Sequence, residues 1–476
     1  MISHSTDRRV PADRALPHLA QLFDVQAMKR SLAAEWAGDV AGAAVAQVLG
    51  CEIERVKYRP GRNCVVGYRV RLQMPSRPGG AGRRRAAQRI AVARISAAMY
   101  PAVEAEARFE RARQSSAGPE FPPRLSLLRD AGVLLWRFPH DRKLAALPQL
   151  SDSAWLRRTW LPEMVAARWG EDWRIAGVRN ELIGYFPDHS ATLRSRLRLL
   201  QNSRDRSRLW NIYGKVRYDD SGEEVFASMA ALFDSEASRE GIVGYARPLA
   251  SYPAERVLWQ EGIDAPTLDR QLLAGSVDSA QWARIARAVA GLHGTALALA
   301  PSMNRATLQA DIERAAATLI AAAPTAAGDV QSLASDLERR IGSVDLAPRA
   351  TLHGDLHSKN ILMDARRVHQ IDLDRLGSGP ALAELGSLLA ELVLRDCLAG
   401  RSLDWSRISG VATEYSFASS ARIDVGDLGW QVAAALLRER AYRCVTSLKP
   451  GRLEILPALL AAARAALEGA LGKEAR

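Results

Sequence analysis

Two kinds of hydrophobic pattern divide the chain. Between residues 14 and 50 apolar side chains recur three or four positions apart, which is the spacing of a helix. From Cys51 the pattern changes to strict alternation, and Val56–Leu72 with Pro60-Gly61 inside it predicts two strands joined by a tight turn. After Gln260 helical spacing returns and continues to the end of the chain.

The strand pattern occurs twice. Val56–Leu72 and Ile183–Leu199 align without a gap and share five identical residues of 17, which indicates an internal duplication. Further strands are predicted after each copy, at residues 89–95 and 131–136 in the first and at 211–216 and 255–259 in the second. The sequence therefore predicts two lobes of one design in tandem.

The helical region contains one polar interruption, Thr351–Pro380, which is dense in His, Asp and Asn. Within it, the apolar runs 361–363 and 368–373 flank a turn and predict a small hairpin. The clearest predicted helices around it are residues 282–297, 307–320, 330–341, 430–445 and 456–471.

Composition and charge exclude several classes of protein. With 48% hydrophobic and 25% charged residues the chain is typical of a globular protein. It contains no apolar run long enough to cross a membrane, and residues 1–20 lack the apolar core of a secretory signal, so we expect a cytoplasmic protein without a membrane partner. The four cysteines have no metal-ligand spacing and predict neither a zinc site nor a disulfide framework.

The net charge of +12 is concentrated near the N-terminus, where residues 1–100 hold 17 Lys or Arg and 7 Asp or Glu, a net of +10. Such a region could attract nucleic acid. However, its densest cluster, Arg83–Arg85 with Arg89, follows the turn residues 75–82 and favours a solvated loop between strands, since no known nucleic-acid module surrounds it. We do not expect a nucleic-acid partner.

The polar interruption contains candidate metal ligands. Asp355, Asn360 and Asp372 offer the hard oxygen atoms that Mg²⁺ prefers when it also holds phosphate oxygens. Zinc bound by His353 and His357 is less favoured, because no third nitrogen or sulfur ligand is nearby.

The two motifs of this region resemble a known family. His353–Leu362 reads HGDLHSKNIL and Ile371–Asp374 reads IDLD, which is similar to the catalytic and metal-binding loops of the aminoglycoside phosphotransferase and choline kinase-like family. The resemblance covers roughly residues 176–471 and implies an α+β, bilobal, protein-kinase-like fold. We expect a duplicated, degenerate β-rich lobe before a mostly helical C-terminal lobe. The expected domains are an N-terminal helical segment (1–50), a degenerate small lobe (51–175), a nucleotide-binding small lobe (176–260) and a catalytic lobe (261–476).

The resemblance also assigns roles to the two loops. Asp355 would accept the proton of the attacking hydroxyl, and Asn360 and Asp372 would hold Mg²⁺ against the phosphates of ATP. The supporting residues are His353, His357 and Asp374, of which the two histidines are expected to act through hydrogen bonds.

The same resemblance places the nucleotide in the second lobe. Lys215 lies on its third predicted strand, where this fold's lysine meets the α- and β-phosphates, whereas the corresponding position of the first lobe is assigned to Arg94. Arginine does not replace lysine conservatively at a phosphate site. The other ATP-binding candidates are Glu224 (or its neighbour Glu223) as the lysine's partner, Arg194 facing the phosphates, and Gln260 and Glu261 in the hinge.

These assignments predict a Mg-ATP-dependent kinase that phosphorylates a hydroxyl of a sugar, an aminoglycoside or an amino alcohol. A polycationic acceptor would need an acidic cleft, for which Glu384, Glu391 and Asp396 are candidates. The alternative is a non-catalytic, pseudokinase-like, nucleotide-binding regulatory or scaffold protein, which a duplicated lobe lacking its lysine would suit. The sequence leaves the acceptor and a homo-oligomeric state open.

Overall fold

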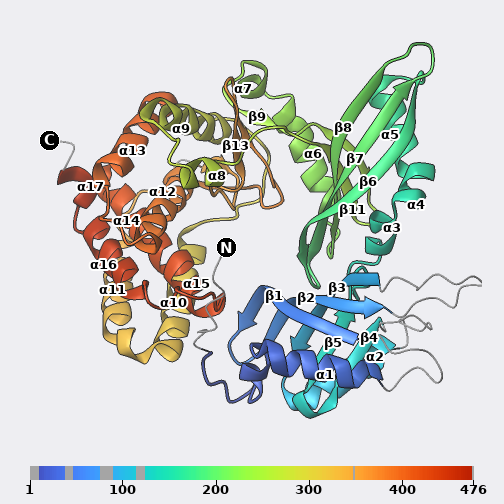
Figure 1. The fold of residues 1–476 in the computed structure, drawn as a ribbon. Helices are drawn as coiled ribbons and strands as arrows, with labels where there is room; N and C mark the ends of the chain where they lie inside the picture. The colour runs from blue at the N-terminus through green and yellow to red at the C-terminus, as the bar shows by residue number, and fades with distance from the viewer. Residues whose placement is uncertain (1–9, 38–46, 75–88, 114–123, 347–348, 474–476) are drawn as a thin grey trace, which may run out of the picture.

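The computed structural model describes residues 10–37, 47–74, 89–113, 124–346 and 349–473. Figure 1 shows two β-rich parts (blue to green) and a helical part (yellow to red), which confirms the predicted α+β fold class. The arginine cluster Arg83–Arg85 and the turn before it lie outside the described residues. Among the helices that the structure describes, none is long and apolar enough to span a membrane.

The first β-rich part is a five-stranded antiparallel sheet in the order β1-β2-β3-β5-β4. Its helices and strands are η1 (Leu19–Leu22), α1 (Val25–Ala37), β1 (Gln47–Arg59), β2 (Asn63–Met74), β3 (Arg89–Met99), α2 (Ala102–Arg113), β4 (Leu125–Leu128), η2 (Arg129–Ala131) and β5 (Val133–Arg137). The helical pattern predicted up to residue 50 is wrong at its end, because β1 already begins at Gln47.

The second β-rich part repeats this topology. Its sheet has the order β6-β7-β8-β11-β10, which is the order of the first sheet strand for strand. It consists of α3 (Leu147–Ser151), α4 (Ser153–Arg158), α5 (Trp160–Trp169), β6 (Trp173–Phe186), β7 (Ser190–Gln201), β8 (Ser207–Arg217), α6 (Gly222–Phe233), α7 (Glu236–Arg239), β9 (Gly244–Tyr245), β10 (Pro248–Tyr252) and β11 (Val257–Glu261).

The repeat extends to single hydrogen bonds at the turn after the first strand. Asp13 Oδ2 accepts hydrogen bonds from the Tyr58 hydroxyl (2.9 Å) and the Gly61 amide (2.8 Å). In the second sheet Asp141 Oδ2 accepts them from the Tyr185 hydroxyl (2.8 Å) and the backbone amide of residue 188 (2.9 Å). Each turn contains one residue with a left-handed backbone conformation, Gly61 in the first and Asp188 in the second. Aspartate tolerates this conformation better than most residues with a side chain.

The segments that carry these aspartates are also related in sequence. Residues 11–24 and 139–152 are identical at eight of 14 positions. Each segment packs on the sheet that follows it: Leu16, Leu19 and Leu22 belong to the core of the first sheet, and Leu144, Leu147 and Leu150 to that of the second. We infer that the second unit begins near residue 139, upstream of the boundary expected at 176.

The helical part is built around one hydrophobic core. Its helices are α8 (Leu268–Leu273), α9 (Ser279–His293), α10 (Arg305–Ala322), η3 (Pro324–Ala326), α11 (Ala327–Arg340), α12 (Ala381–Leu398), α13 (Trp405–Ser419), α14 (Val425–Ala435), the π-helical turn η4 (Leu436–Ala441), α15 (Tyr442–Thr446), α16 (Leu456–Leu467) and α17 (Ala470–Lys473). The predicted hairpin is present as β13 (Ile361–Met363) and β14 (Val368–Gln370), which pairs with β9, and β12 (Arg349–Leu352) pairs with β15 (Gly377–Pro380).

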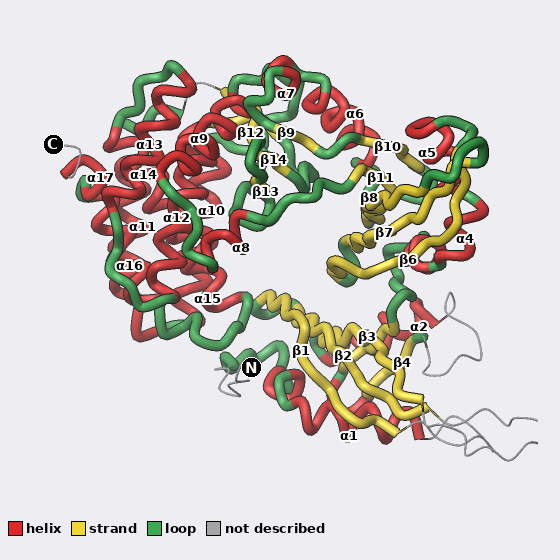
Figure 2. Tube along the Cα trace, turned by 45° about the horizontal axis from the view of Figure 1, so that its top comes forward, coloured by secondary structure: helices red, strands yellow, loops and turns green. Residues whose placement is uncertain are grey.

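The first sheet contacts both other parts of the molecule. Leu448, which follows α15, is buried in the core of the first sheet. The Arg55 guanidinium of β1 lies 3.1 Å above the Phe186 ring at the end of β6. Figure 2 shows the first sheet below the second sheet and the helical part, with β1 close to α15.

Candidate active site

The HGDLHSKN loop leaves β12 and is held by a buried carboxylate. Glu384, in the first turn of α12, accepts hydrogen bonds from the backbone amides of His353 (2.9 Å) and Gly354 (2.7 Å), and from His293 Nε2 (3.0 Å). Burial disfavours the ionised form of Glu384, but the neighbouring histidines and these hydrogen bonds outweigh it and keep its pKa below the ordinary value. Glu384 therefore positions the loop, and His293 supports Glu384.

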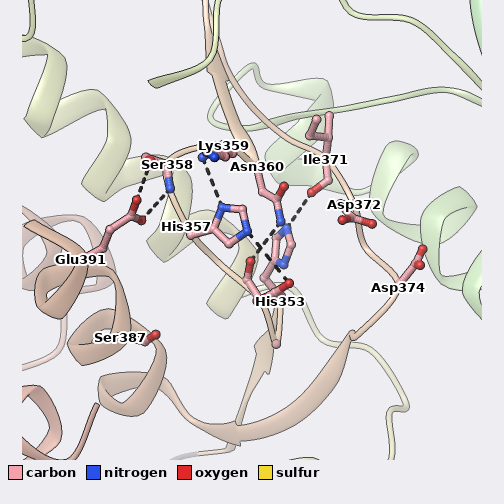
Figure 3. Close-up of polar contacts among 12 residues, drawn as sticks. His353, His357, Ser358, Lys359, Asn360, Ile371, Asp372, Asp374, Ser387 and Glu391 are labelled. Carbon is pink, nitrogen blue, oxygen red and sulfur yellow. Dashed lines mark hydrogen bonds and ion pairs between the residues drawn. The ribbon is translucent and has the colours of Figure 1, made fainter. Parts of the chain in front are cut away.

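Two further contacts join this loop to the IDLD loop. His353 Nε2 donates a hydrogen bond to the Ile371 carbonyl (2.9 Å), and the Ile371 amide donates one to the Asn360 carbonyl (2.9 Å). The Asn360 side-chain amide donates to the Asp355 carbonyl (3.0 Å), so its side-chain oxygen is not used by this bond. Figure 3 shows the side chains of His353, Asn360 and Asp372 gathered at this junction.

Lys215 connects the second sheet to these loops. Its Nζ lies 2.5 Å from Asp372 Oδ1 and 2.5 Å from Asp374 Oδ2. Asp374 also pairs with Arg217, two residues further along the same strand and thus on the same face (2.5 Å). The predicted pairing of Lys215 with Glu224 is corrected here: the lysine reaches across to the metal-loop carboxylates, while Glu224 is exposed on α6.

This cluster has strong electrostatic interactions. Burial disfavours the charged Lys215, but the carboxylates of Asp374 and Asp372 outweigh it and raise the pKa of Lys215 above 10.5. Burial likewise acts against the ionised Asp372, yet attraction to Lys215 keeps the pKa of Asp372 below 3.8. The carboxylates of Asp372 and Asp374 thus already attract one cation, the Lys215 ammonium. The same negative charge would attract a divalent metal ion. The oxygen donors of Asp372 and Asn360 fit Mg²⁺ in kind, and the residues that the structure describes contain no cluster of three acidic, His or Cys ligands.

The strand register corrects the predicted counterpart of Lys215 in the first sheet. Lys215 lies opposite Thr192, the third residue of β7, and the third residue of β2 is Val65, which lies opposite Ala98. Ala98 is buried and apolar. Arg94 instead occupies a different position on β3 and pairs with a glutamate of β1 at 3.0 Å. The first sheet therefore places no basic side chain at the position of Lys215.

Of the other sequence-predicted ATP residues, Arg194 shares a sheet face with Lys215, because their positions on β7 and β8 are two residues apart in register. Its guanidinium pairs with Glu181 on β6. Gln260 and Glu261 are the last two residues of β11. The Glu261 side chain is already used, since its Oε1 accepts a hydrogen bond from Trp210 Nε1 (2.8 Å).

Asp355 and His357 lie side by side at the loop surface. The His357 Nε2 is 4.0 Å from Asp355 Oδ2, and its Nδ1 accepts a hydrogen bond from the Lys359 amide (3.2 Å). Burial lowers the pKa of His357, so it is neutral at neutral pH. The arrangement leaves the Asp355 carboxylate one third exposed, and thus within reach of an acceptor.

The candidate acidic cleft is not present as expected. Glu391 accepts hydrogen bonds from the Ser358 amide (2.8 Å) and hydroxyl (2.6 Å), so it supports the loop from behind (Figure 3). Asp396 is buried between Arg401 (2.8 Å) and Arg407 (2.5 Å). Sequence reasoning missed Arg217, although its spacing of two from Lys215 on a predicted strand is the signal that could have found it.

Comparisons with known proteins agree with the motifs. Residues 224–407 match the model of the phosphotransferase enzyme family. No curated protein matches the sequence. Similar solved structures include a choline/ethanolamine kinase family protein from Mesorhizobium loti (16% identity, TM-score 0.42, 66% of this chain and 95% of that one) and choline kinase from Streptococcus pneumoniae (12%, 0.41, 65% and 99%). A thermostable mutant of an aminoglycoside phosphotransferase has 13% identity and a TM-score of 0.41 over 65% of this chain and 99% of that one. The resemblance indicated by the motifs is thereby confirmed: the segment of this chain that carries both loops matches the phosphotransferase enzyme family.

Proposed function

We propose that this protein is an ATP-dependent kinase that phosphorylates a hydroxyl group of a small molecule. The observation that carries the proposal is the contact of Lys215 with Asp372 and Asp374, which brings a phosphate-binding type of cation to a pair of carboxylates beside the Asp355 loop. Phosphoryl transfer needs positioning and charge neutralisation more than covalent chemistry, and these are the groups it uses.

In the proposed reaction the acceptor oxygen attacks the γ-phosphorus of ATP, the bond to the β,γ-bridging oxygen breaks, and ADP leaves with that electron pair. Asp355 takes the hydroxyl proton. Lys215 and Arg217 balance the charge of the phosphates, and Asn360 and Asp372 would hold Mg²⁺. Mg²⁺ held there would supply charge neutralisation to the phosphates.

We propose a supporting role for the first sheet. It has no counterpart of Lys215, and its contacts go to the turn after β6, where this fold places nucleotide phosphates. Arg55 of β1 lies over Phe186 at the start of that turn, while Asp188 within the turn pairs with Arg142 of the second unit. In this proposal the first sheet restrains a turn that lacks the glycines of a typical phosphate loop.

Thermal unfolding with and without Mg-ATP tests the function, because a ligand that binds only the folded state raises the midpoint. We expect a magnesium-dependent rise for the wild type that Lys215→Ala and Asp372→Ala lose. Asp205→Ala, in the exposed loop between β7 and β8, is the matched control and should keep the rise. No rise at saturating Mg-ATP would contradict the kinase.

A further inference from the structure

A cavity of about 460 Å³ opens beside the proposed catalytic base. One wall is the loop that carries Gly354, Asp355 and His357, and the opposite walls come from α10, α12, η4 and α15. The lining contains five arginines from four different segments: Arg314, Arg375, Arg438, Arg440 and Arg443. In the proposed reaction the acceptor lies here, because Asp355 is part of the lining.

The π-helical turn η4 accounts for much of this lining. It carries three consecutive charged residues, Arg438, Glu439 and Arg440, all of which line the cavity. π-Helical turns are rare and are found frequently at functional sites. Both arginine side chains are more than nine-tenths buried, at 7% and 6% exposure.

The lining holds four carboxylates, Asp311, Asp355, Glu384 and Glu439, against five arginines. Glu439 forms ion pairs with Arg438 (2.7 Å) and Arg440 (3.5 Å). Asp311 forms an ion pair with Arg314 (2.6 Å) and a longer one with Arg438 (3.8 Å). The Glu384 carboxylate is already engaged by the loop amides and His293. Arg314, Arg438 and Arg440 thus share the carboxylates of Asp311 and Glu439.

The other two arginines add to this excess. Arg375 and Arg443 are exposed at the cavity, and no ion pair with either is found among the described residues. In addition, the Nε–H groups of Arg438 and Arg440 are buried and find no acceptor in the part of the chain that the structure describes. The cavity therefore offers two guanidinium groups, those of Arg375 and Arg443, without an ion pair among the described residues.

We propose that the acceptor is an anionic hydroxyl compound, one that carries a phosphate or carboxylate group beside the hydroxyl to be phosphorylated. Arginine forks bind these groups with two parallel hydrogen bonds. A polycationic acceptor would instead meet Arg375 and Arg443, the two arginines without an ion pair in the described part of the chain, which repel positive charge. This inference rests on the proposed kinase function for the reaction, but the anion preference of the cavity can be measured without it.

Isothermal titration of the full chain without nucleotide tests the preference. The probes are glucose 6-phosphate, gluconate, inorganic phosphate, glucose and glucosamine. We expect at least one of the three anions to bind tenfold or more tightly than glucose and glucosamine, and phosphate against gluconate tells which anionic group is preferred. Equal or tighter binding of glucosamine, or no saturable binding of any anion, would overturn the proposal.

Variants locate the binding. Arg443→Gln should weaken binding of the preferred anion tenfold or more and Arg443→Lys should restore part of it, whereas Arg287→Gln, an exposed arginine of α9 outside the cavity, should change nothing. Anion binding that is unaffected by Arg443→Gln would overturn the assignment to this cavity.

The Mg-ATP thermal shift, measured on the same samples, separates the two proposals. Arg443→Gln should keep this shift, because it lies away from the Lys215 cluster. A Mg-ATP shift without anion binding would support the kinase proposal and contradict the anionic acceptor. Anion binding without a Mg-ATP shift would contradict the kinase proposal and support the anion site.

Discussion

Lys215 Nζ lies 2.5 Å from Asp372 Oδ1, an ion pair between residues 157 positions apart in the chain. The lysine comes from a central strand of the second sheet and the aspartate from the loop after β14 in the helical part. Asp372 also has a left-handed backbone with φ of 65°, which is uncommon for a residue other than glycine and is found frequently where a functional group must be aimed. The contact therefore joins the two parts at the point where nucleotide is proposed to bind.

Removing this cation should reduce catalysis more than folding. Lys215→Met keeps the aliphatic stem but leaves the phosphates without the ammonium, and losing one such group in a site costs about 10²-fold or more in kcat/KM. Lys143→Met, an exposed lysine of the same unit, is the control and should stay within about twofold of wild type. Steady-state kinetics with a coupled ADP assay measures both. Full activity of Lys215→Met would contradict the proposed role.

The same ion pair predicts a pH dependence of stability at both extremes. Because the folded pKa of Asp372 lies below its ordinary 3.8, the stabilisation is complete above 3.8 and is lost as the pH falls through the folded pKa. Because the folded pKa of Lys215 lies above 10.5, its contribution is complete below 10.5 and is lost as the pH rises through the folded pKa. Urea unfolding across pH 2–12 should therefore show a loss of the free energy of unfolding at both extremes, and each loss should be weaker in Lys215→Met. An identical pH profile of stability in wild type and Lys215→Met would contradict the pairing.

Glu384 should be a large contributor to stability. Its removal leaves the His353 and Gly354 amides and the His293 ring without their buried partner, and breaking a buried charged network typically costs about 3–5 kcal/mol. We expect Glu384→Ala to lose stability in this range in urea unfolding, and Glu384→Gln to lose less, since it keeps an acceptor oxygen. Glu240→Ala, on the surface, should lose less than about 0.5 kcal/mol. Loss of activity without loss of stability in Glu384→Ala would point to a direct catalytic role instead.

Gly354 is required by its surroundings as well as by its backbone. Its φ is +78°, and a Cβ there would lie 2.0 Å from the Arg375 carbonyl oxygen. Gly275 has a similar φ of +65° but open space around it. Gly275→Ala should therefore show only the cost of backbone strain, about 1–2 kcal/mol, and Gly354→Ala should cost more and abolish phosphoryl transfer. Thermal unfolding and activity assays measure both variants. Equal losses of stability and activity in Gly354→Ala and Gly275→Ala would contradict the prediction.

The duplicated turns provide a matched pair of variants. Tyr185→Phe and Tyr58→Phe each remove one hydroxyl hydrogen bond to an aspartate, which costs about 1 kcal/mol of stability in either sheet. Only Tyr185 supports the turn before β7, where nucleotide phosphates are proposed to lie. Tyr185→Phe should raise the KM for ATP severalfold while Tyr58→Phe leaves it unchanged. An equal effect of both variants on KM would remove the functional difference between the two turns.

Local patterns were sufficient to predict much of this molecule. The alternation of apolar residues predicted the paired strands, because a strand with one buried face requires a period of two. Two short motifs predicted the loops, since Asp355, Asn360 and Asp372 lie within 20 residues of one another and their relation depends on a small local hairpin. The repeated Tyr58 and Tyr185 segments predicted the tandem arrangement of the sheets.

What the sequence left open were relations between distant segments. The register of β3 on β2, which moves the counterpart of Lys215 from Arg94 to Ala98, depends on where two strands pair and not on the composition of either. The partner of Lys215 depends on how closely the second sheet approaches the helical part.

The charge of the acceptor cavity is a relation of the same kind. Glu384, Glu391 and Asp396 are as acidic in sequence as any candidate for a cationic substrate, but packing turns them to histidine, serine and arginine partners. Arg314, Arg375 and Arg443 lie far apart in the chain and become neighbours only around the cavity. The sequence by itself determined the strands, the repeat and the candidate site residues, because these depend on local spacing. The ion pairs and the charge that lines the cavity were decided by the tertiary structure, because electrostatic interactions depend on distance in space.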